Sequence, residues 1–389
     1  MRKAVPVRAS DGDPGKIAIT NCHIHTFTID HLPQGYYRFF GINPMKLLRQ
    51  PWIRAPVIWL GERKFLSERL NRAMRFARIA ANATQADVFK TVREYYPGNT
   101  RFVILPMDMA LMGWGEPSVP IQTQHDQLHA LAQDHPGRVL PFCAVEPRRG
   151  EAAMQELRRC VEELGFHGVK LYPPLGYLPT HELLMEQVYP YCIERNIPVM
   201  SHCSQGGVAE KGSSQATHDE RANPHAFIPV LERFPDLRVC LAHFGGDAAW
   251  NDFLGPHAIG RVRSPAEQDE NNWLHRLLDM LRAEVDGQPK YPGLYTDISY
   301  TAFRFRQNLP ALDVFLSDDR VADKVLFGSD YFMTETEETS ERRMSIELRY
   351  AIGEANFRRI AERNPCHWLD GSQATCSEEQ PPQADPQVA

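Results

Sequence analysis

The segment Val139–Leu171 reads VLPFCAVEPRRGEAAMQELRRCVEELGFHGVKL and contains one complete unit of the expected fold. It opens with an apolar run over Val139–Val145, and a second apolar run follows at Gly168–Leu171. Between the runs, apolar side chains recur at helical spacing: Met154, Leu157, Val161 and Leu164. Apolar runs without polar alternation are typical of strands covered on both faces. The segment therefore predicts a strand, a helix and a second, parallel strand.

The same alternation runs along the whole chain. The predicted strands are Ile17–Cys22, Phe102–Met107, Val139–Val145, Gly168–Leu171, Pro198–Ser201, Arg238–Ala242, Gly293–Ile298 and Lys324–Gly328. The predicted helices are Gln124–Asp134, Glu151–Leu164, His181–Arg195, Pro224–Phe234, Asn272–Glu284 and Ala311–Leu316. Eight strands alternating with helices predict an α/β fold of the (β/α)8 TIM barrel type. A doubly wound open sheet is the alternative, but no glycine-rich phosphate loop follows any strand.

The chain has 389 residues, more than the roughly 250 of a typical barrel. We expect one barrel domain over residues 1–370, with the excess in insertions. Residues 28–100, rich in aromatics and arginine and then helical, separate the first two strands and predict a cap over the pocket. A second insertion covers residues 246–271. Residues 371–389 are polar and proline-rich, which predicts a disordered tail.

Composition excludes several classes of partner. The net charge of −6 gives no basic field for nucleic acid. No apolar stretch is long enough to cross a membrane, and the N-terminus lacks the apolar centre of a secretory signal. The eight cysteines show no paired spacing, which favours reduced thiols. We therefore expect a cytoplasmic protein that binds a small molecule, with no nucleic acid and no membrane partner.

Polar side chains stand at or near the ends of five predicted strands, where barrel enzymes place their catalytic groups. They are His23 and His25 after the first strand, Lys170 in the fourth, His202 after the fifth, His243 after the sixth and Asp330 after the eighth. Each alone has an ordinary explanation, such as a hydrogen-bonded histidine, a helix-capping aspartate or an ion-paired lysine. Together they would converge on one mouth of the barrel, which predicts a functional site.

The residue types suit metal-assisted chemistry. His23, His25 and His202 would supply three neutral nitrogens and leave one position open, as a catalytic zinc site requires. Such an ion lowers the pKa of water towards about 7. Asp330 would ligate the ion weakly, accept the water proton and deliver it to a leaving group. His243 would orient the water or polarise a substrate oxygen. Hydrolysis and decarboxylation remain equally compatible with this set.

Five stretches resemble the amidohydrolase superfamily, and specifically the "amidohydrolase 2" family that includes the aminocarboxymuconate semialdehyde decarboxylase type. They are Cys22-His-Ile-His25, Phe166-His-Gly-Val-Lys-Leu-Tyr-Pro-Pro174, Ser201-His-Cys-Ser-Gln-Gly-Gly207, Phe234-Pro-Asp-Leu-Arg-Val-Cys-Leu-Ala-His-Phe-Gly-Gly246 and Leu326-Phe-Gly-Ser-Asp-Tyr331. The resemblance implies one divalent ion, with zinc expected and manganese as the alternative. It implies His23, His25, His202 and Asp330 as metal ligands. His243 and Asp330 are then the expected catalytic residues.

Three functions stay open. The first is a metal-dependent hydrolase of a small ester, lactone or amide; the second is a non-oxidative decarboxylase of an aromatic or unsaturated acid. The third is a non-catalytic binding protein on a barrel scaffold. Decarboxylases of the family often combine a short first loop with a carboxylate-binding arginine, so the long loop here favours the hydrolase. Arg221, Arg304 and Arg306 cannot be assigned that role from sequence. Lys170 is expected to pack under the pocket or bind a substrate carboxylate, and barrels of this kind often form homodimers.

Overall fold

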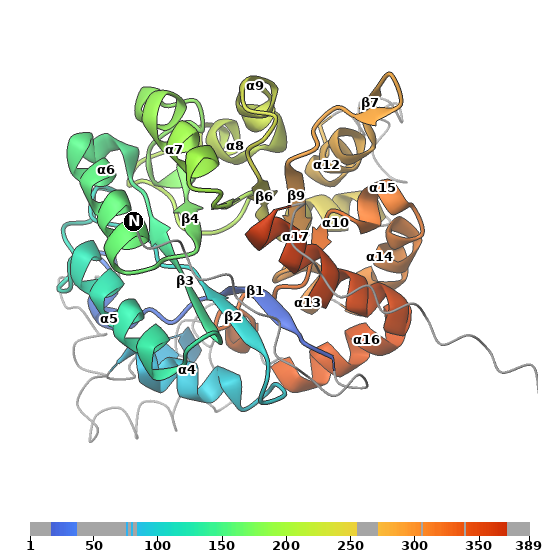
Figure 1. Ribbon diagram of the computed structural model, residues 1–389, viewed down its shortest axis with the longest axis horizontal. Coiled ribbons are helices and arrows are strands. Elements are labelled where there is room, and N and C mark those ends of the chain that lie inside the picture. The colour runs from blue at the N-terminus through green and yellow to red at the C-terminus, as the bar shows by residue number, and fades with distance from the viewer. Residues whose placement is uncertain are drawn as a thin grey trace, which may run out of the picture.

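Eight parallel strands form the centre of the molecule in the order β1-β2-β3-β4-β5-β6-β9-β10 (Figure 1). The computed structural model describes residues 17–36, 75–76, 79–80, 84–254, 271–304, 306–337 and 340–371. The strands are β1 Thr20–Ile24, β2 Arg101–Ile104, β3 Val139–Ala144, β4 Gly168–Leu171, β5 Val199–Ser201, β6 Val239–Leu241, β9 Leu294–Asp297 and β10 Val325–Leu326. All eight overlap the predicted strands.

Backbone hydrogen bonds join the last strand to the first and close the barrel. The Cys22 N–H donates to the Phe327 carbonyl at 2.8 Å, and the Asp330 N–H donates to the His23 carbonyl at 2.9 Å. A parallel bridge between Ile24 and Tyr331 continues the pairing. The predicted (β/α)8 barrel is therefore confirmed.

Helices surround the strands, and each of the six predicted helices overlaps one of them. They are α4 Gln85–Arg93, α5 Ile121–Asp134, α6 Glu151–Arg158, α7 Tyr189–Glu194, α8 Gln215–Ala222, α9 Ile228–Arg233, α10 Asp247–Leu254, α12 Trp273–Arg282, α13 Thr301–Arg304, α14 Leu309–Leu316, α15 Asp319–Ala322, α16 Glu341–Arg358 and α17 Asn364–Asp370. A short hairpin, β7 Glu284–Val285 with β8 Gln288–Pro289, follows α12. The sequence did not predict α16, whose apolar positions are few and whose helix is interrupted at Gly353, φ +74°.

The strand register separates an inner core from an outer one. Lys170 pairs with Met200, Met200 with Cys240, and Cys240 with Tyr295, so the four side chains lie in one layer. The last three belong to a compact apolar cluster: Cys22, Val103, Leu105, Leu140, Phe142, Met200, Cys240, Ala242, Tyr295, Leu326, Trp368 and Leu369. The alternate strand residues pack outward against the helices. Lys170 therefore lies inside the barrel.

Some sequence predictions fall wholly or partly outside the described residues. They include most of the cap at residues 28–100, residues 255–270 of the second insertion and the tail from residue 372. In the part of the chain that is described, no helix is both long and apolar enough to cross a membrane. Six cysteines are free and buried: Cys22, Cys143, Cys160, Cys192, Cys203 and Cys240. Cys366 is disulfide-bonded, so the expectation of eight reduced thiols was wrong at this position.

Candidate metal centre

His23 and His25 point one ring nitrogen each at Asp330. His23 Nε2 lies 3.7 Å from Asp330 Oδ1, and His25 Nε2 lies 3.1 Å from the same oxygen. The opposite nitrogens are donors, because His23 Nδ1 faces Asp297 Oδ2 at 2.8 Å and His25 Nδ1 faces the Leu105 carbonyl at 2.7 Å. Carboxylate and carbonyl oxygens only accept, so in each neutral ring Nε2 carries the lone pair. Two lone pairs and a carboxylate oxygen thus face one another.

Asp330 lies just beyond β10 and is 5% exposed. Its Oδ1, like His23 Nε2, is buried and has no hydrogen-bond partner among the described residues. A buried polar atom without a partner costs about 1–3 kcal/mol. A divalent cation between these atoms would satisfy them together, so the donor set fits a metal ion.

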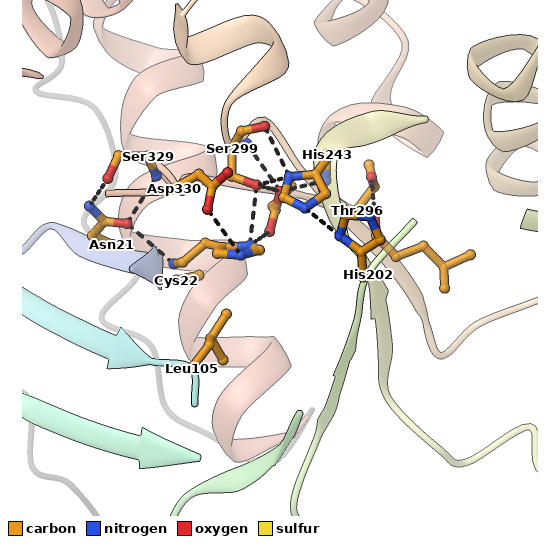
Figure 2. Close-up of polar contacts among 12 residues, drawn as sticks. Asn21, Cys22, Leu105, His202, His243, Thr296, Ser299, Ser329 and Asp330 are labelled. Atoms are coloured by element: carbon orange, nitrogen blue, oxygen red, sulfur yellow. Dashed lines mark hydrogen bonds and ion pairs between the residues drawn. The ribbon is translucent and has the colours of Figure 1, made fainter. Parts of the chain in front are cut away.

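His202 and His243 are the other two predicted histidines and lie next to each other (Figure 2). His202 follows β5 and stacks on Tyr172 with ring centres 4.2 Å apart. Its Nε2 faces the Gly206 carbonyl at 2.9 Å, and its Nδ1 lies 3.1 Å from His243 Nε2. The rings of His23 and His243 lie 4.9 Å apart. The structure therefore brings His23, His25 and Asp330 together, and His243 connects His202 to this group.

The hydrogen-bond chain through His202 and His243 lacks one proton. The chain runs from the Gly206 carbonyl through His202, His243 and Ser299 to Asp297, and makes four contacts. Both ends are acceptors, while two neutral imidazoles and one hydroxyl supply only three protons. At least one contact must therefore join two lone pairs. A cation bound to His202 Nδ1 removes this conflict without protonating either ring, and leaves the lone pair of His243 Nε2 free to accept a proton.

Burial keeps these histidines neutral. It lowers the pKa values of His23, His202 and His243 well below their usual 6.5; Lys170 depresses that of His23 further, and His243 that of His202. Neutral imidazole is the form that binds metal ions.

Lys170 lies beneath this group with its Nζ buried and without a hydrogen-bond partner among the described residues. Burial lowers its pKa to about 8, although Asp297 and Asp330 act in the opposite direction. Its Nζ is 5.8 Å from the centre of the Tyr172 ring. Lys170 is thus close to the site, and its ammonium group is buried without a hydrogen-bonded counter-charge among the described residues.

Asp297 at the end of β9 is a residue that the sequence analysis missed. Its Oδ2 accepts from the ring nitrogen Nδ1 of His23. Its Oδ1 accepts from the backbone N–H of His243 at 2.9 Å, from the backbone N–H of Ser299 at 3.0 Å and from the Ser299 hydroxyl. The available signal was a carboxylate inside the predicted strand Gly293–Ile298, where apolar residues are the norm. Through these bonds Asp297 orients the His23 ring and holds the backbone of His243.

A second cluster of ligand-type side chains lies away from the site and is structural. His125, Cys143 and Cys160 approach one another in the buried layer. However, His125 Nδ1 donates to Glu156 at 2.6 Å and its Nε2 accepts from the Ala144 N–H at 3.1 Å. Both nitrogens are therefore used in tying α5 to α6 and β3.

Two of the arginines considered as carboxylate binders are engaged elsewhere. Arg221 pairs with Glu210 at 2.8 Å and Arg306 pairs with Glu347. The Arg304 side chain lies outside the described residues.

Two known proteins are similar in sequence to parts of this chain. A 2-keto-4-carboxy-3-hexenedioate hydratase from Sphingobium sp. (strain NBRC 103272 / SYK-6) is 29% identical over 137 residues, 33% of this chain. A 2-amino-3-carboxymuconate-6-semialdehyde decarboxylase from Dictyostelium discoideum is 22% identical over 200 residues, 48% of this chain. These matches span only 38% and 53% of the relatives' own lengths.

The fold is also found in a solved structure of 5-carboxyvanillate decarboxylase from Novosphingobium aromaticivorans, complexed with manganese and 4-hydroxy-3-methoxy-5-nitrobenzoic acid. It aligns with 92% of this chain and 97% of its own, at 12% identity and a TM-score of 0.55. The sequence model of the amidohydrolase family, Amidohydro_2, matches residues 117–370. The chain therefore belongs to the amidohydrolase family.

Proposed function

We propose that this protein is a metal-dependent hydrolase that acts on a small ester, lactone or amide. The observation that carries the proposal is the set of buried acceptor atoms that face one another around Asp330 Oδ1 and between His202 and His243. Such contacts are unfavourable unless a cation lies among them.

In this proposal His23, His25, His202 and Asp330 hold one divalent ion. The ion supplies positive charge that polarises a substrate oxygen and makes water more acidic. Three imidazoles and one carboxylate suit zinc. Manganese is the alternative ion, because it is the metal in the related fold of 5-carboxyvanillate decarboxylase.

His243 is the proposed general base. Its Nε2 lies 3.1 Å from His202 Nδ1, and burial lowers the pKa of the ring, so Nε2 is unprotonated before the reaction. His243 would accept the first proton of the attacking water, and Asp330 would accept the second and deliver it to the leaving group, since its carboxylate is buried beside both His23 and His25. The hydratase relative also uses water as a reactant, which favours this reading.

Non-oxidative decarboxylation of an aromatic or unsaturated acid is the second candidate. The relative from Dictyostelium discoideum is a decarboxylase. Lys170 is the described cation best placed to bind a substrate carboxylate, because its Nζ is buried under the site without a hydrogen-bond partner among the described residues. A charge-assisted hydrogen bond of this kind would fix the acid in one orientation.

Three secondary proposals remain from the sequence. We propose that residues 28–100 cap the mouth, because the Gly35 N–H donates to the Trp114 carbonyl at 2.8 Å and Lys211 lies 4.9 Å above the Trp114 ring. These contacts join the loops after β1, β2 and β5. The six free buried cysteines favour the cytoplasm, and a homodimer is the assembly to test by light scattering.

Two measurements test the main proposal. Elemental analysis of gently purified protein should find about one zinc or manganese ion per chain, and a metal-free active enzyme would refute it. The metal-loaded protein is then incubated with lactones, amides, esters and aromatic acids in ¹⁸O-labelled water. A hydrolase places ¹⁸O in a new carboxylate, whereas a decarboxylase releases CO2. Stoichiometric metal with tight ligand binding and no turnover across the panel would favour the binding protein.

A further inference from the structure

Ser299 lies between the Asp297 carboxylate and the His243 ring. It follows β9 and is fully buried. Its Oγ donates to Asp297 Oδ1 and lies 2.9 Å from His243 Nδ1. Its carbonyl oxygen lies 3.4 Å from the same nitrogen. One serine thus presents two oxygens to one side of the His243 ring (Figure 2).

The Ser299 hydroxyl has three polar neighbours: Asp297 Oδ1, His243 Nδ1 and, at 3.2 Å, His23 Nδ1. The proton of His23 Nδ1 already goes to Asp297 Oδ2, so the first two neighbours decide the direction of the hydroxyl. The hydroxyl has one proton, and the contact with Asp297 joins it to a carboxylate oxygen that can only accept. If the proton pointed to His243 instead, the serine oxygen would face that carboxylate oxygen with no hydrogen between them. A charge-assisted bond to Asp297 is the stronger choice. The serine oxygen must then accept from His243.

This direction fixes the tautomer of His243. Its Nδ1 must carry the proton, because the Ser299 hydroxyl oxygen and the Ser299 carbonyl both accept there. Its Nε2 is then the unprotonated nitrogen and lies on the side of the metal ligands.

We propose that Ser299 is a positioning residue that holds His243 in the Nδ1–H tautomer, so that Nε2 is the proton acceptor of the reaction. The proposal rests on the function proposed above for His243. It adds a residue that touches neither substrate nor metal and acts through the imidazole ring. The loss of one such hydrogen bond corresponds to about a 2- to 12-fold change in the tautomer ratio.

The test reads the tautomer directly by ¹⁵N NMR of histidine side chains, in metal-free and zinc-loaded protein. The His243 signal is identified by its loss in His243→Asn. In the unsubstituted protein we expect a protonated Nδ1 and a bare Nε2. In Ser299→Ala we expect the ratio to shift towards Nε2–H, with kcat falling more than KM rises. Ser299→Thr, which keeps the hydroxyl, should restore both.

The matched control is Ser201→Ala. Ser201 is buried in β5, and among the described residues its hydroxyl donates to the His202 carbonyl at 3.4 Å and to no side chain. The His243 signal should therefore not change in this variant. An Nε2–H tautomer in the unsubstituted protein overturns the proposal without any variant. An unchanged His243 spectrum in folded Ser299→Ala also overturns it. Since the spectrum needs neither substrate nor turnover, these results stand apart from failure of the hydrolase proposal.

Discussion

Replacement of Asp297 by asparagine tests how the protein prepares His23 for a metal ion. The two side chains have nearly the same shape, but asparagine has one acceptor oxygen where aspartate has two. In the structure Oδ1 of Asp297 accepts three hydrogen bonds, from the backbone N–H groups of His243 and Ser299 and from the Ser299 hydroxyl. Oδ2 accepts the fourth, from His23 Nδ1.

The three donors decide which way the new amide turns. The oxygen must stay with them, because the opposite orientation would place an NH2 group against three hydrogens. The NH2 group then faces His23 Nδ1, which becomes an acceptor, and the proton of His23 moves to Nε2. His23 would have to reverse this arrangement before it could bind a metal ion, as with other outer partners of metal-binding histidines.

The expected loss is about 10- to 100-fold in metal affinity, or about 1.4–2.7 kcal/mol. It can be measured by competition of the folded variant with a zinc-sensitive chelator, with circular dichroism to confirm folding. Asp108→Asn is the control, because Asp108 is also buried but pairs with Arg149 at 3.0 Å outside the site. Equal zinc affinity in Asp297→Asn and the unsubstituted protein would refute the tautomer argument.

Three further perturbations address the ligands, the substrate and the buried acid. His25→Ala should lose most of its bound metal, whereas His243→Ala should keep it and lose at least about 100-fold in kcat; normal turnover in His243→Ala would contradict its role. Lys170→Met should raise KM for carboxylate substrates by about tenfold or more with metal content unchanged, and an unchanged KM would exclude Lys170 from substrate binding. Burial raises the pKa of Glu341 from 4.5 to about 8. The folded chain therefore keeps a proton that the unfolded chain releases above 4.5, and stability should fall by up to about 5 kcal/mol as pH rises from about 4.5 to about 8. Urea unfolding across this range should show the slope, and Glu341→Gln should flatten it; equal slopes would show that Glu341 ionises normally.

The sequence predicted the parts of the fold that depend on continuous apolar runs. Runs such as Val139–Val145 and Gly168–Leu171 have few alternatives to buried strands, because both faces are apolar. The barrel closure then follows from the number of strands and the crossover helices. Helix α16 was not predicted, because most of its exposed residues are charged and Gly353 interrupts its apolar spacing.

The ligand types were also predictable, since a barrel brings the carboxyl ends of its strands to one mouth. The partners of those ligands were not. Asp297 and Ser299 carry no motif, and their importance comes from contacts with His23 and His243 that join positions far apart in the chain. Strand alternation alone also misplaces Cys22, the neighbour of His23: it is buried in the inner apolar cluster and not on the outer face of its strand.

The orientation of two histidines departs from strand alternation, and local backbone geometry explains both departures. Cys22 faces inward, so regular alternation would turn His23 outward; the pairing of β1 with β2 shifts register between Asn21 and Ile24, which returns His23 to the interior. Ala242 also faces inward, and His243 next to it has φ of +69°. A left-handed conformation costs about 1–3 kcal/mol in a residue other than glycine. The Asp297 carboxylate accepts the His243 N–H and, through Ser299, holds its ring. The same carboxylate that orients His23 therefore also stabilises the turn that brings His243 to it.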